Sequence, residues 1–576
     1  MVSSSVTMER FAKPFRFRQE RVALPFMGLI TSVLVMVPLL LLVRVSLAPP
    51  GALPFAVSTF TVENYATIFL DPVTYRLLGN TLIYAGGSVL EALVIAFVLA
   101  WISERSDIRG SGLIRTAMFI SLALPPLAVT FGWILLLNPG NGAVNVFIQN
   151  MTGMQESPFD IYTMEMMIFI SGLALAPTMY VMLCGVLRNM DPHLESAAEV
   201  AGSDRLAVLW YVTLPLITPG LLSVVVYSSM LMVQVFDTPL VIGLTAGVPV
   251  LSTRIYTLSS PEGALPQYGL AAAFGVFLLA LAMVLMWGYF RAVGVSEKFH
   301  VVTGRGFRPR KVKLGRWRYA AILFAIAYFG LILPPLLTLL WTSLLRFYEV
   351  PSLEALKQLT FANYQTVIGL NVVKRAVGNT IILMLSTATI SMVLASIISW
   401  YSIRRQTRWT RWLDAMAFTP MAVPGIVMGV AVLLAYIHTP LYGTIWIIVL
   451  AQVTVSLPFG TRTMNGALVQ IHKDLENAAA ASGATWVTSL RTIALPLLLP
   501  HFLNGWLWTV AHSMRDLTIP FLLRTTDNVV ISPTLLQLWN TPNYPGASAL
   551  AILMIFALMA LVVPVQIFLL RRESAW

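Results

Sequence analysis

Long apolar stretches alternate with short polar segments along this chain, and the apolar stretches predict membrane-spanning helices. A helix that crosses the hydrocarbon core of a bilayer needs about 20 mainly apolar residues. Stretches of that length lie near residues 22–48, 79–103, 113–137, 163–188, 220–243, 269–291, 318–343, 377–402, 412–437, 443–463, 500–522 and 548–570. The pattern therefore predicts an all-α polytopic membrane protein with twelve transmembrane helices.

The composition supports this class. Of the 576 residues, 57% are hydrophobic and 11% are charged, whereas soluble domains carry about 25% charged residues. The single cysteine, Cys184, excludes an intrachain disulfide framework. The first apolar stretch is longer than the apolar region of a cleavable signal peptide, which has about 7–15 residues, so we expect it to remain as the first helix.

The basic residues predict the orientation of the chain in the membrane. Loops rich in Lys and Arg stay in the cytoplasm, and such residues gather before the first span, in segment 292–317 and after the last span. The loop between spans three and four has neither Lys nor Arg. We therefore expect both termini in the cytoplasm, and we assign the net charge of +12 to a lipid bilayer rather than to nucleic acid.

The chain also contains an internal repeat. Residues 60–81 align with 359–380 at an offset of 299, and both segments end in Gly-Asn-Thr; farther along, the offset becomes 281. Because each half has an even number of spans, the halves are related by an axis along the membrane normal. The expected organisation is a cytoplasmic basic tail at 1–21, a first half at 22–291 (core repeat about 76–291), a basic cytoplasmic linker at 292–317, a second half at 318–570 (core repeat about 375–570) and a cytoplasmic tail at 571–576.

One cytoplasmic passage is strongly repeated. Residues 195–219 and 476–500 are identical at nine of 25 positions, against roughly two for unrelated segments of average composition. Each copy has an acidic residue near a helix start, small alanines that continue the helix, and a glycine that can end it in the left-handed conformation. In the first copy, Asp191 and Pro192 fit the N-cap and the first helical position. The two passages predict paired docking elements for a two-fold partner; the alternative is a surface helix–turn–helix that lies on the bilayer.

The pattern Glu-x-Ala-Ala, three residues, Gly and Leu-Pro-x-x-x-Pro resembles the EAA loop of binding-protein-dependent ABC importer permeases. The fused halves are similar to the ferric-iron-type permeases of that class. This resemblance implies the type I ABC importer permease fold, with two parallel-related six-helix halves. The positions that it implies for contact with the ATPase are Glu195, Ala197, Ala198 and Gly202, and Glu476, Ala478, Ala479 and Gly483. The first copy departs from the pattern at Ser196, where alanine or a second acid is common.

The resemblance also implies a function and a set of partners. The chain would form the translocation pathway in a bacterial inner membrane, above two copies of a cytosolic ABC ATPase that hold ATP and Mg. A periplasmic or extracellular binding protein would deliver the substrate. Ferric iron is the expected substrate, and thiamine, phosphonate and polyamine are the alternatives. No cofactor is expected in this chain.

Among the ionisable residues inside predicted spans, where such groups are costly and are functional candidates, three are candidates for the translocation path. They are Asp237 in the fifth span and the adjacent Arg515 and Asp516 in the eleventh. We interpret them as part of the translocation path or its gate; the alternative is a polar contact that joins the halves.

The sequence shows no metal-site spacing, no phosphate loop and no catalytic triad, so we expect neither a metal centre nor an enzyme. A second class, an ion-coupled secondary transporter with parallel repeats, predicts midplane carboxylates and broken helices. Because few such carboxylates are present, this class is the weaker alternative.

Overall fold

The computed structural model describes residues 20–52, 59–188, 192–260, 265–297, 311, 314–483 and 486–573, and these residues form helices and loops without a strand. The expected all-α class is confirmed. The helical segments of the first half are α1 (Glu20–Ser46), α2 (Glu63–Leu70), α3 (Pro72–Arg105), α4 (Ser111–Leu122), α5 (Pro126–Leu137), α6 (Ala143–Thr152), α7 (Met164–Arg188), α8 (Pro192–Val200), α9 (Arg205–Val208), the π-helical turn η1 (Leu209–Thr213), α10 (Leu214–Gln234), the π-helical turn η2 (Pro239–Gly243), α11 (Leu251–Ser259) and α12 (Tyr268–Glu297).

The second half repeats this order. Its helical segments are α13 (Trp317–Ser343), the 3-10 turn η3 (Ala355–Gln358), α14 (Ala362–Gly369), α15 (Asn371–Arg405), α16 (Arg408–Phe418), the 3-10 turn η4 (Thr419–Ala422), α17 (Gly425–Tyr436), α18 (Ile445–Gln470), α19 (Lys473–Ala481), α20 (Trp486–Ser489), the π-helical turn η5 (Leu490–Ala494), α21 (Leu495–Arg515), α22 (Thr518–Leu523), α23 (Ile531–Asn540) and α24 (Tyr544–Glu573). The tail at 1–19 and most of the predicted linker at 292–317 lie outside the described residues.

Two predicted spans are bent rather than continuous. Among the described residues, ten helices are long and apolar enough to cross a membrane, and two bent pairs would raise the number to 12. α4 and α5 meet at 96°, and the α16–η4 segment meets α17 at 112°. The predicted spans over 113–137 and 412–437 therefore each contain a sharp bend. Pro125, Pro126 and Pro424 stand at these breaks, where a proline removes a backbone donor and disfavours helix at the preceding residue.

The fifth and eleventh spans end earlier than their patterns predict. α10 stops at Gln234 rather than near 243, and α21 stops at Arg515 rather than near 522. At each break the backbone extends, with ψ of 137° at Val235 and 125° at Asp516, before the short segments η2 and α22 begin. The breaks place Asp516 between α21 and α22, and Asp237 at the first helical position before η2.

The first helix of each half packs on the other half. α1 contacts α16 and α17 of the second half, and α13 contacts α5 of the first half. The Ser32 hydroxyl lies 3.6 Å from the Met416 sulfur across the contact of α1 with α16. Where α5 crosses α13, a Cβ on Gly132 would stand 2.3 Å from the Pro335 carbonyl oxygen, so the approach requires glycine. The halves are thus interlocked.

The repeated Gly-Asn-Thr motif has the same structural role in both halves. The Thr81 hydroxyl accepts a hydrogen bond from the N–H of Leu251 at the start of α11, and Thr380 accepts one from Ile531 at the start of α23, both at 3.0 Å. These bonds satisfy donors that a helix N-terminus leaves without an intrahelical partner. The preceding asparagines donate to backbone carbonyls of the same loops. The motif therefore ties α3 to α11 and α15 to α23.

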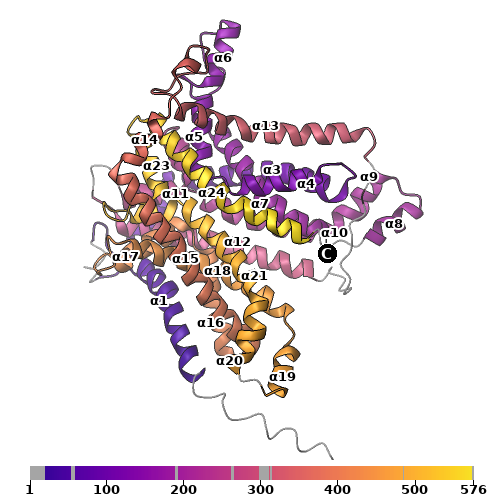
Figure 1. The fold of residues 1–576 in the computed structure, drawn as a ribbon. Helices are drawn as coiled ribbons and strands as arrows, with labels where there is room; N and C mark the ends of the chain where they lie inside the picture. The colour runs from indigo at the N-terminus through magenta and orange to yellow at the C-terminus, as the bar shows by residue number, and fades with distance from the viewer. Residues whose placement is uncertain are drawn as a thin grey trace, which may run out of the picture.

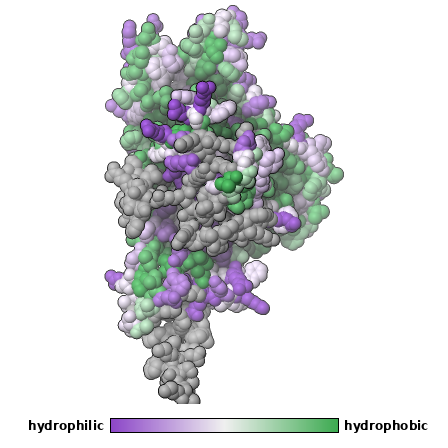
Figure 2. Space-filling model, turned by 90° about the vertical axis from the view of Figure 1, so that its right-hand side faces the viewer, coloured by the Kyte–Doolittle hydropathy of each residue, from purple (hydrophilic) through white to green (hydrophobic). Residues whose placement is uncertain are grey.

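The molecule has two arms that diverge from one end. Figure 1 shows α11, α14 and α23 at the joined end, α8 and α9 at the tip of one arm, and α19 and α20 at the tip of the other. α6 projects at the top of this view, away from both tips. The long helices expose large apolar side chains, for example Leu40 at 67% and Trp287 at 64%, as lipid contact requires. Figure 2 shows such apolar surface flanking a group of hydrophilic side chains on the face that lies at the right in Figure 1.

Candidate functional site

The first repeated passage forms a short helix, a turn and a second helical segment. α8 begins at Pro192, as predicted; the expected N-cap Asp191 lies outside the described residues. Gly202 follows α8 with φ of 89°, the left-handed conformation that its place in the pattern predicts. Ala197 and Gly202 are exposed and Ala198 is half-buried. The arm tip therefore presents small residues that another protein could approach closely.

Glu195 faces inward rather than toward a partner. Its carboxylate accepts hydrogen bonds from Arg105 at 3.0 Å and from the Thr213 hydroxyl at 2.8 Å. The Arg105 side chain, at the end of α3, is fully buried, and that of Glu195 is 9% exposed. This pair fastens α8 to a transmembrane helix, so a displacement of α8 is transmitted to α3.

The second passage repeats the arrangement at the other arm tip. Gly483 ends α19 with φ of 81°, Ala478 is exposed and Ala479 is half-buried. The side chain of Glu476 lies outside the described part of the chain. Arg404 aligns with Arg105 at the offset of 299 and donates to the Ile471 carbonyl at 3.0 Å. An arginine thus stands at the end of the aligned helix in both halves.

An ionic cluster around the buried Glu104, which the sequence pattern did not reveal, lies next to the first passage. Glu104 accepts hydrogen bonds from Arg115 at 3.0 Å and from Arg188 at 2.8 and 2.9 Å, which joins α3, α4 and α7. In the second half, Asp414 takes the aligned place of Arg115 and bonds to Arg462 at 3.2 Å on α18. The aligned positions 115 and 414 thus carry charges of opposite sign. A residue-by-residue alignment of the two halves could have identified this difference.

A chamber of about 310 Å³ lies between the halves, at the breaks that follow α10 and α21. Asp237 lines it from the first half, and Arg515 and Thr518 line it from the second. Asp237 and Thr518 are aligned positions, at the offset of 281. Most of the lining residues belong to the first half, and the second half contributes Ile332, Arg515 and Thr518.

The three predicted intramembrane charges come together at this chamber. The Asp516 carboxylate accepts hydrogen bonds from the Gln452 amide at 3.1 Å and from the Thr518 N–H at 3.2 Å. Arg515 donates to the Leu122 carbonyl of the first half. Asp237 forms no hydrogen bond with any described residue, and its Oδ1 is buried.

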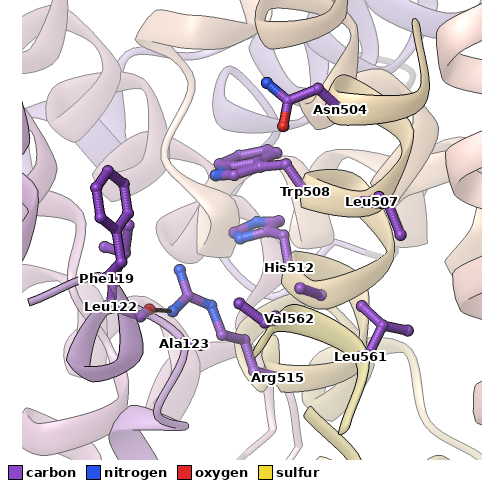
Figure 3. A pocket seen from close by; sticks show the side chains of 11 residues that line it. Phe119, Leu122, Ala123, Asn504, Leu507, Trp508, His512, Arg515, Leu561 and Val562 are labelled. Atoms are coloured by element: carbon purple, nitrogen blue, oxygen red, sulfur yellow. Dashed lines mark hydrogen bonds between the residues drawn. The ribbon is translucent and has the colours of Figure 1, made fainter. Parts of the chain in front are cut away.

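A smaller cavity of about 100 Å³ adjoins the Arg515 side chain. Figure 3 shows the guanidinium pointing toward Leu122, with His512 and Trp508 stacked above it on the same helix. The rings of His512 and Trp508 are 5.1 Å apart and nearly parallel at 6°. Because Arg515 lines both cavities, its side chain separates them.

Aromatic side chains close the chamber toward the joined end. Phe236, which lines the chamber, packs against Tyr256 of α11 with ring centroids 5.6 Å apart. Phe521 of the second half approaches Tyr256 at 5.2 Å and Phe236 at 6.2 Å. Since α11 lies away from both arm tips (Figure 1), this aromatic contact lies on the side of the chamber opposite to α8 and α19.

The described residues contain no group of three or more His, Cys, Asp or Glu side chains that could hold a metal ion. The chamber therefore offers separate polar groups to a solute, without a preformed coordination shell.

The chain matches a family model twice. The model of the binding-protein-dependent transport system inner membrane component matches residues 77–292 and 388–573. The two matches fall on the two halves that the sequence repeat defines.

Two of the relatives match most of this chain, and a third matches about a third of it. The ferric transport system permease protein FbpB of Actinobacillus pleuropneumoniae is 24% identical over 88% of this chain and 72% of its own. The putative ferric transport system permease protein FbpB 1 of Haemophilus influenzae is 25% identical over 82% of this chain and 74% of its own. The spermidine/putrescine transport system permease protein PotC of Haemophilus influenzae is 31% identical over 31% of this chain and 70% of its own.

Proposed function

This chain belongs to the family of binding-protein-dependent transport system inner membrane components, and on that premise we propose that it carries ferric iron across a bacterial inner membrane. It is a permease subunit of an ABC importer and not an enzyme. The energy comes from ATP hydrolysed on separate ATPase subunits that bind ATP and Mg. Membership of this family rules against the ion-coupled secondary transporter that the sequence also suggested.

The match of both halves to ferric permeases carries the substrate assignment. The two ferric relatives cover 88% and 82% of this chain, whereas the polyamine relative covers 31%. A fused pair of halves is therefore shared with the ferric relatives. Polyamine and phosphonate permeases are also related, which makes their substrates the second candidates.

The two repeated loops are the proposed contacts with two copies of the ATPase. Each arm tip exposes a short helix with small residues, Ala197 on one and Ala478 on the other. Two similar tips on one chain suit two identical partners related by a two-fold axis. The positive-inside rule puts both tips in the cytoplasm, together with both termini.

Transport then follows from movement of the arms. In the form described here the arms diverge, and the aromatic contact of Phe236, Tyr256 and Phe521 closes the opposite end. ATP-driven approach of the two ATPases would bring the tips together and open that contact toward the binding protein. The two forms must differ in their affinity for ATP and for the loaded binding protein, as any such coupling requires.

The experiment is ATP hydrolysis by the complete importer in proteoliposomes, measured with binding proteins loaded with ferric iron, spermidine, 2-aminoethylphosphonate or thiamine. We expect stimulation by the iron-loaded protein. Stimulation by another loaded protein, with none by iron, would show that the substrate assignment is wrong while leaving the importer class intact.

A paired substitution tests the docking loops in the same assay. Ala197→Arg with Ala478→Arg places long charged side chains at both exposed tips, so the ATPase should no longer copurify although the permease still inserts. Ala362→Arg is the matched control, because Ala362 is an exposed alanine on α14 at the opposite end. Normal ATPase binding by the doubly substituted chain would contradict the assignment of these loops.

A further inference from the structure

We infer that the chamber between the halves is selective for cations and that Asp237 is the residue that balances the charge of a cation in transit. This inference rests on the proposed function, because it treats the chamber as part of the translocation pathway. It adds the sign of the charge that the pathway accepts and the residue that sets it.

The charges around the chamber leave an excess of negative charge. Asp237 and Arg515 line it, and Asp516 adjoins Arg515 along the chain. Both carboxylates interact electrostatically with the one guanidinium, yet neither forms an ion pair with it within 4.0 Å among the described contacts. With both carboxylates ionised, one guanidinium shared by two of them leaves the site a net charge of −1, which attracts a cation and repels an anion.

Asp237 lines the chamber as a half-buried residue whose carboxylate makes no hydrogen bond to any described residue. Its Oδ1 is buried and has no hydrogen-bond partner among the described residues, and the Nε2 of Gln234, which also lines the chamber, is in the same condition. A buried polar atom without a partner costs free energy unless water or a ligand satisfies it. The chamber volume of about 310 Å³ far exceeds the about 15 Å³ that one water needs.

The other polar groups on the wall are oxygen donors that suit a hard cation. Hydroxyl groups come from the first half and from the second, and the Ser171 hydroxyl is held by Tyr84 at 2.7 Å. The hydroxyl-bearing residues on the wall are Ser121, Ser171, Thr178, Thr238 and Thr518. Hard cations prefer oxygen ligands of this kind. With a single carboxylate on the wall, the site would bind such an ion weakly enough to release it, as passage requires.

The asymmetry of the halves supports a dedicated role for Asp237. Its aligned position in the second half is Thr518, which faces the same chamber. A carboxylate kept only for the symmetry of the fold would be expected in both halves. A carboxylate that balances the charge of a cation in transit is needed only once. This chemistry fits ferric iron or a polyamine and does not fit a phosphonate.

The test compares substrate movement with ATP hydrolysis in the complete importer in proteoliposomes, with radiolabelled ferric iron on its binding protein as the probe. Asp237→Asn should lower the iron transported per ATP by about tenfold, a factor that corresponds to about 1.4 kcal/mol, while the loaded binding protein still stimulates ATP hydrolysis. Asp237→Glu should keep most of the transport. Arg515→Gln should transport more iron per ATP than Asp237→Asn, because it removes a repelling charge.

Asp527→Asn is the matched control, since Asp527 is an exposed carboxylate with an 88% accessible side chain on the outer loop before α23. Unchanged transport in Asp237→Asn would overturn the inference, and so would a larger loss in Arg515→Gln than in Asp237→Asn. Loss of ATPase stimulation in Asp237→Asn would also overturn it, because Asp237 would then act in coupling.

Failure of the proposed function is distinguishable from failure of this inference. If iron-loaded protein does not stimulate the unsubstituted importer, the substrate assignment fails, and the same variants are measured with radiolabelled spermidine or 2-aminoethylphosphonate. Loss of spermidine transport in Asp237→Asn would still support a cation-selective chamber. Transport of the phosphonate by the unsubstituted importer would overturn the inference.

Discussion

At the scale of single residues, the Arg105–Glu195 pair determines how the first docking loop is held. A buried ion pair is tolerated best when its remaining polar groups find partners. Here Thr213 supplies a third group to the carboxylate, whereas Nε and Nη2 of Arg105 are buried without a hydrogen-bond partner among the described residues. The sequence predicted the left-handed glycines Gly202 and Gly483, because the need for a helix end is a local property. It did not predict the inward direction of Glu195, because Arg105 lies 90 positions away in the chain.

Arg105→Ala should destabilise the permease by about 3 kcal/mol, because it leaves the Glu195 carboxylate buried without its cation. Adding Glu195→Gln should restore most of this loss, since the uncompensated charge is then gone. Thermal unfolding of the purified chain, followed by tryptophan fluorescence, measures both effects.

Arg109→Ala is the control, because Arg109 is exposed in the loop that follows α3. Equal stability of Arg105→Ala and the unsubstituted chain would show that the pair does not hold α8 to α3. A double variant no more stable than the single one would show that buried charge is not the cause.

At the scale of elements, apolar length predicted where the chain crosses the membrane but not where the helices bend. The spans over 113–137 and 412–437 contain enough apolar residues, so hydropathy alone cannot detect the bends of 96° and 112°. Pro125, Pro126 and Pro424 were the available signal. The early ends of α10 and α21 are followed by Pro239 and Pro520, at aligned positions, and these prolines were the available signal there.

The Gly-Asn-Thr motif provides a prediction for elements. Thr81→Val and Thr380→Val each remove a hydroxyl that accepts a backbone N–H at the start of α11 or α23, and each should lower stability by about 1–3 kcal/mol. Because the two bonds lie in different halves, their effects should add.

Thr67→Val is the matched control, since the Thr67 hydroxyl is exposed and bonds within its own helix at 2.9 Å. Thermal unfolding of the three variants and the double variant decides the matter. Losses no greater than that of Thr67→Val would mean that the motif does not anchor these helices.

At the scale of the whole molecule, the repeat predicted two related halves but not the exchange of their first helices. Apolar residues on a helix show that it contacts lipid or protein, and they do not specify which helix is the neighbour. The contact of α1 with α16 and α17, and that of α13 with α5, depend on three-dimensional packing. The chamber was equally hidden, although the residues that line it included all but one of the predicted intramembrane charges.

A chain divided within the linker at 292–317 should reassemble when both halves are produced together, because α1 and α13 each pack on helices of the opposite half. Either half alone should be degraded, since it lacks the helix that covers it. Copurification through a tag on one half measures assembly. In a Cys184→Ala background, Ser32→Cys and Met416→Cys should form a cross-link between the two pieces. Stable, separately folded halves that do not associate would contradict the exchange of helices.

The exchanged helices impose an order on synthesis. α13 emerges when its partner α5 is already in the membrane, whereas α1 emerges first and its partners α16 and α17 follow more than 360 residues later, since Ser46 ends α1 and Arg408 begins α16. α12 of the first half, which also packs on α1, emerges within that interval, so only the face of α1 that meets α16 and α17 must remain in lipid with its polar groups satisfied. Thr31, buried in the finished fold, already donates its hydroxyl to the Met27 carbonyl of the same helix at 2.8 Å. The Thr31 hydroxyl of the first helix therefore needs no partner from the second half, and completion of the second half ends the exposure of this helix to lipid.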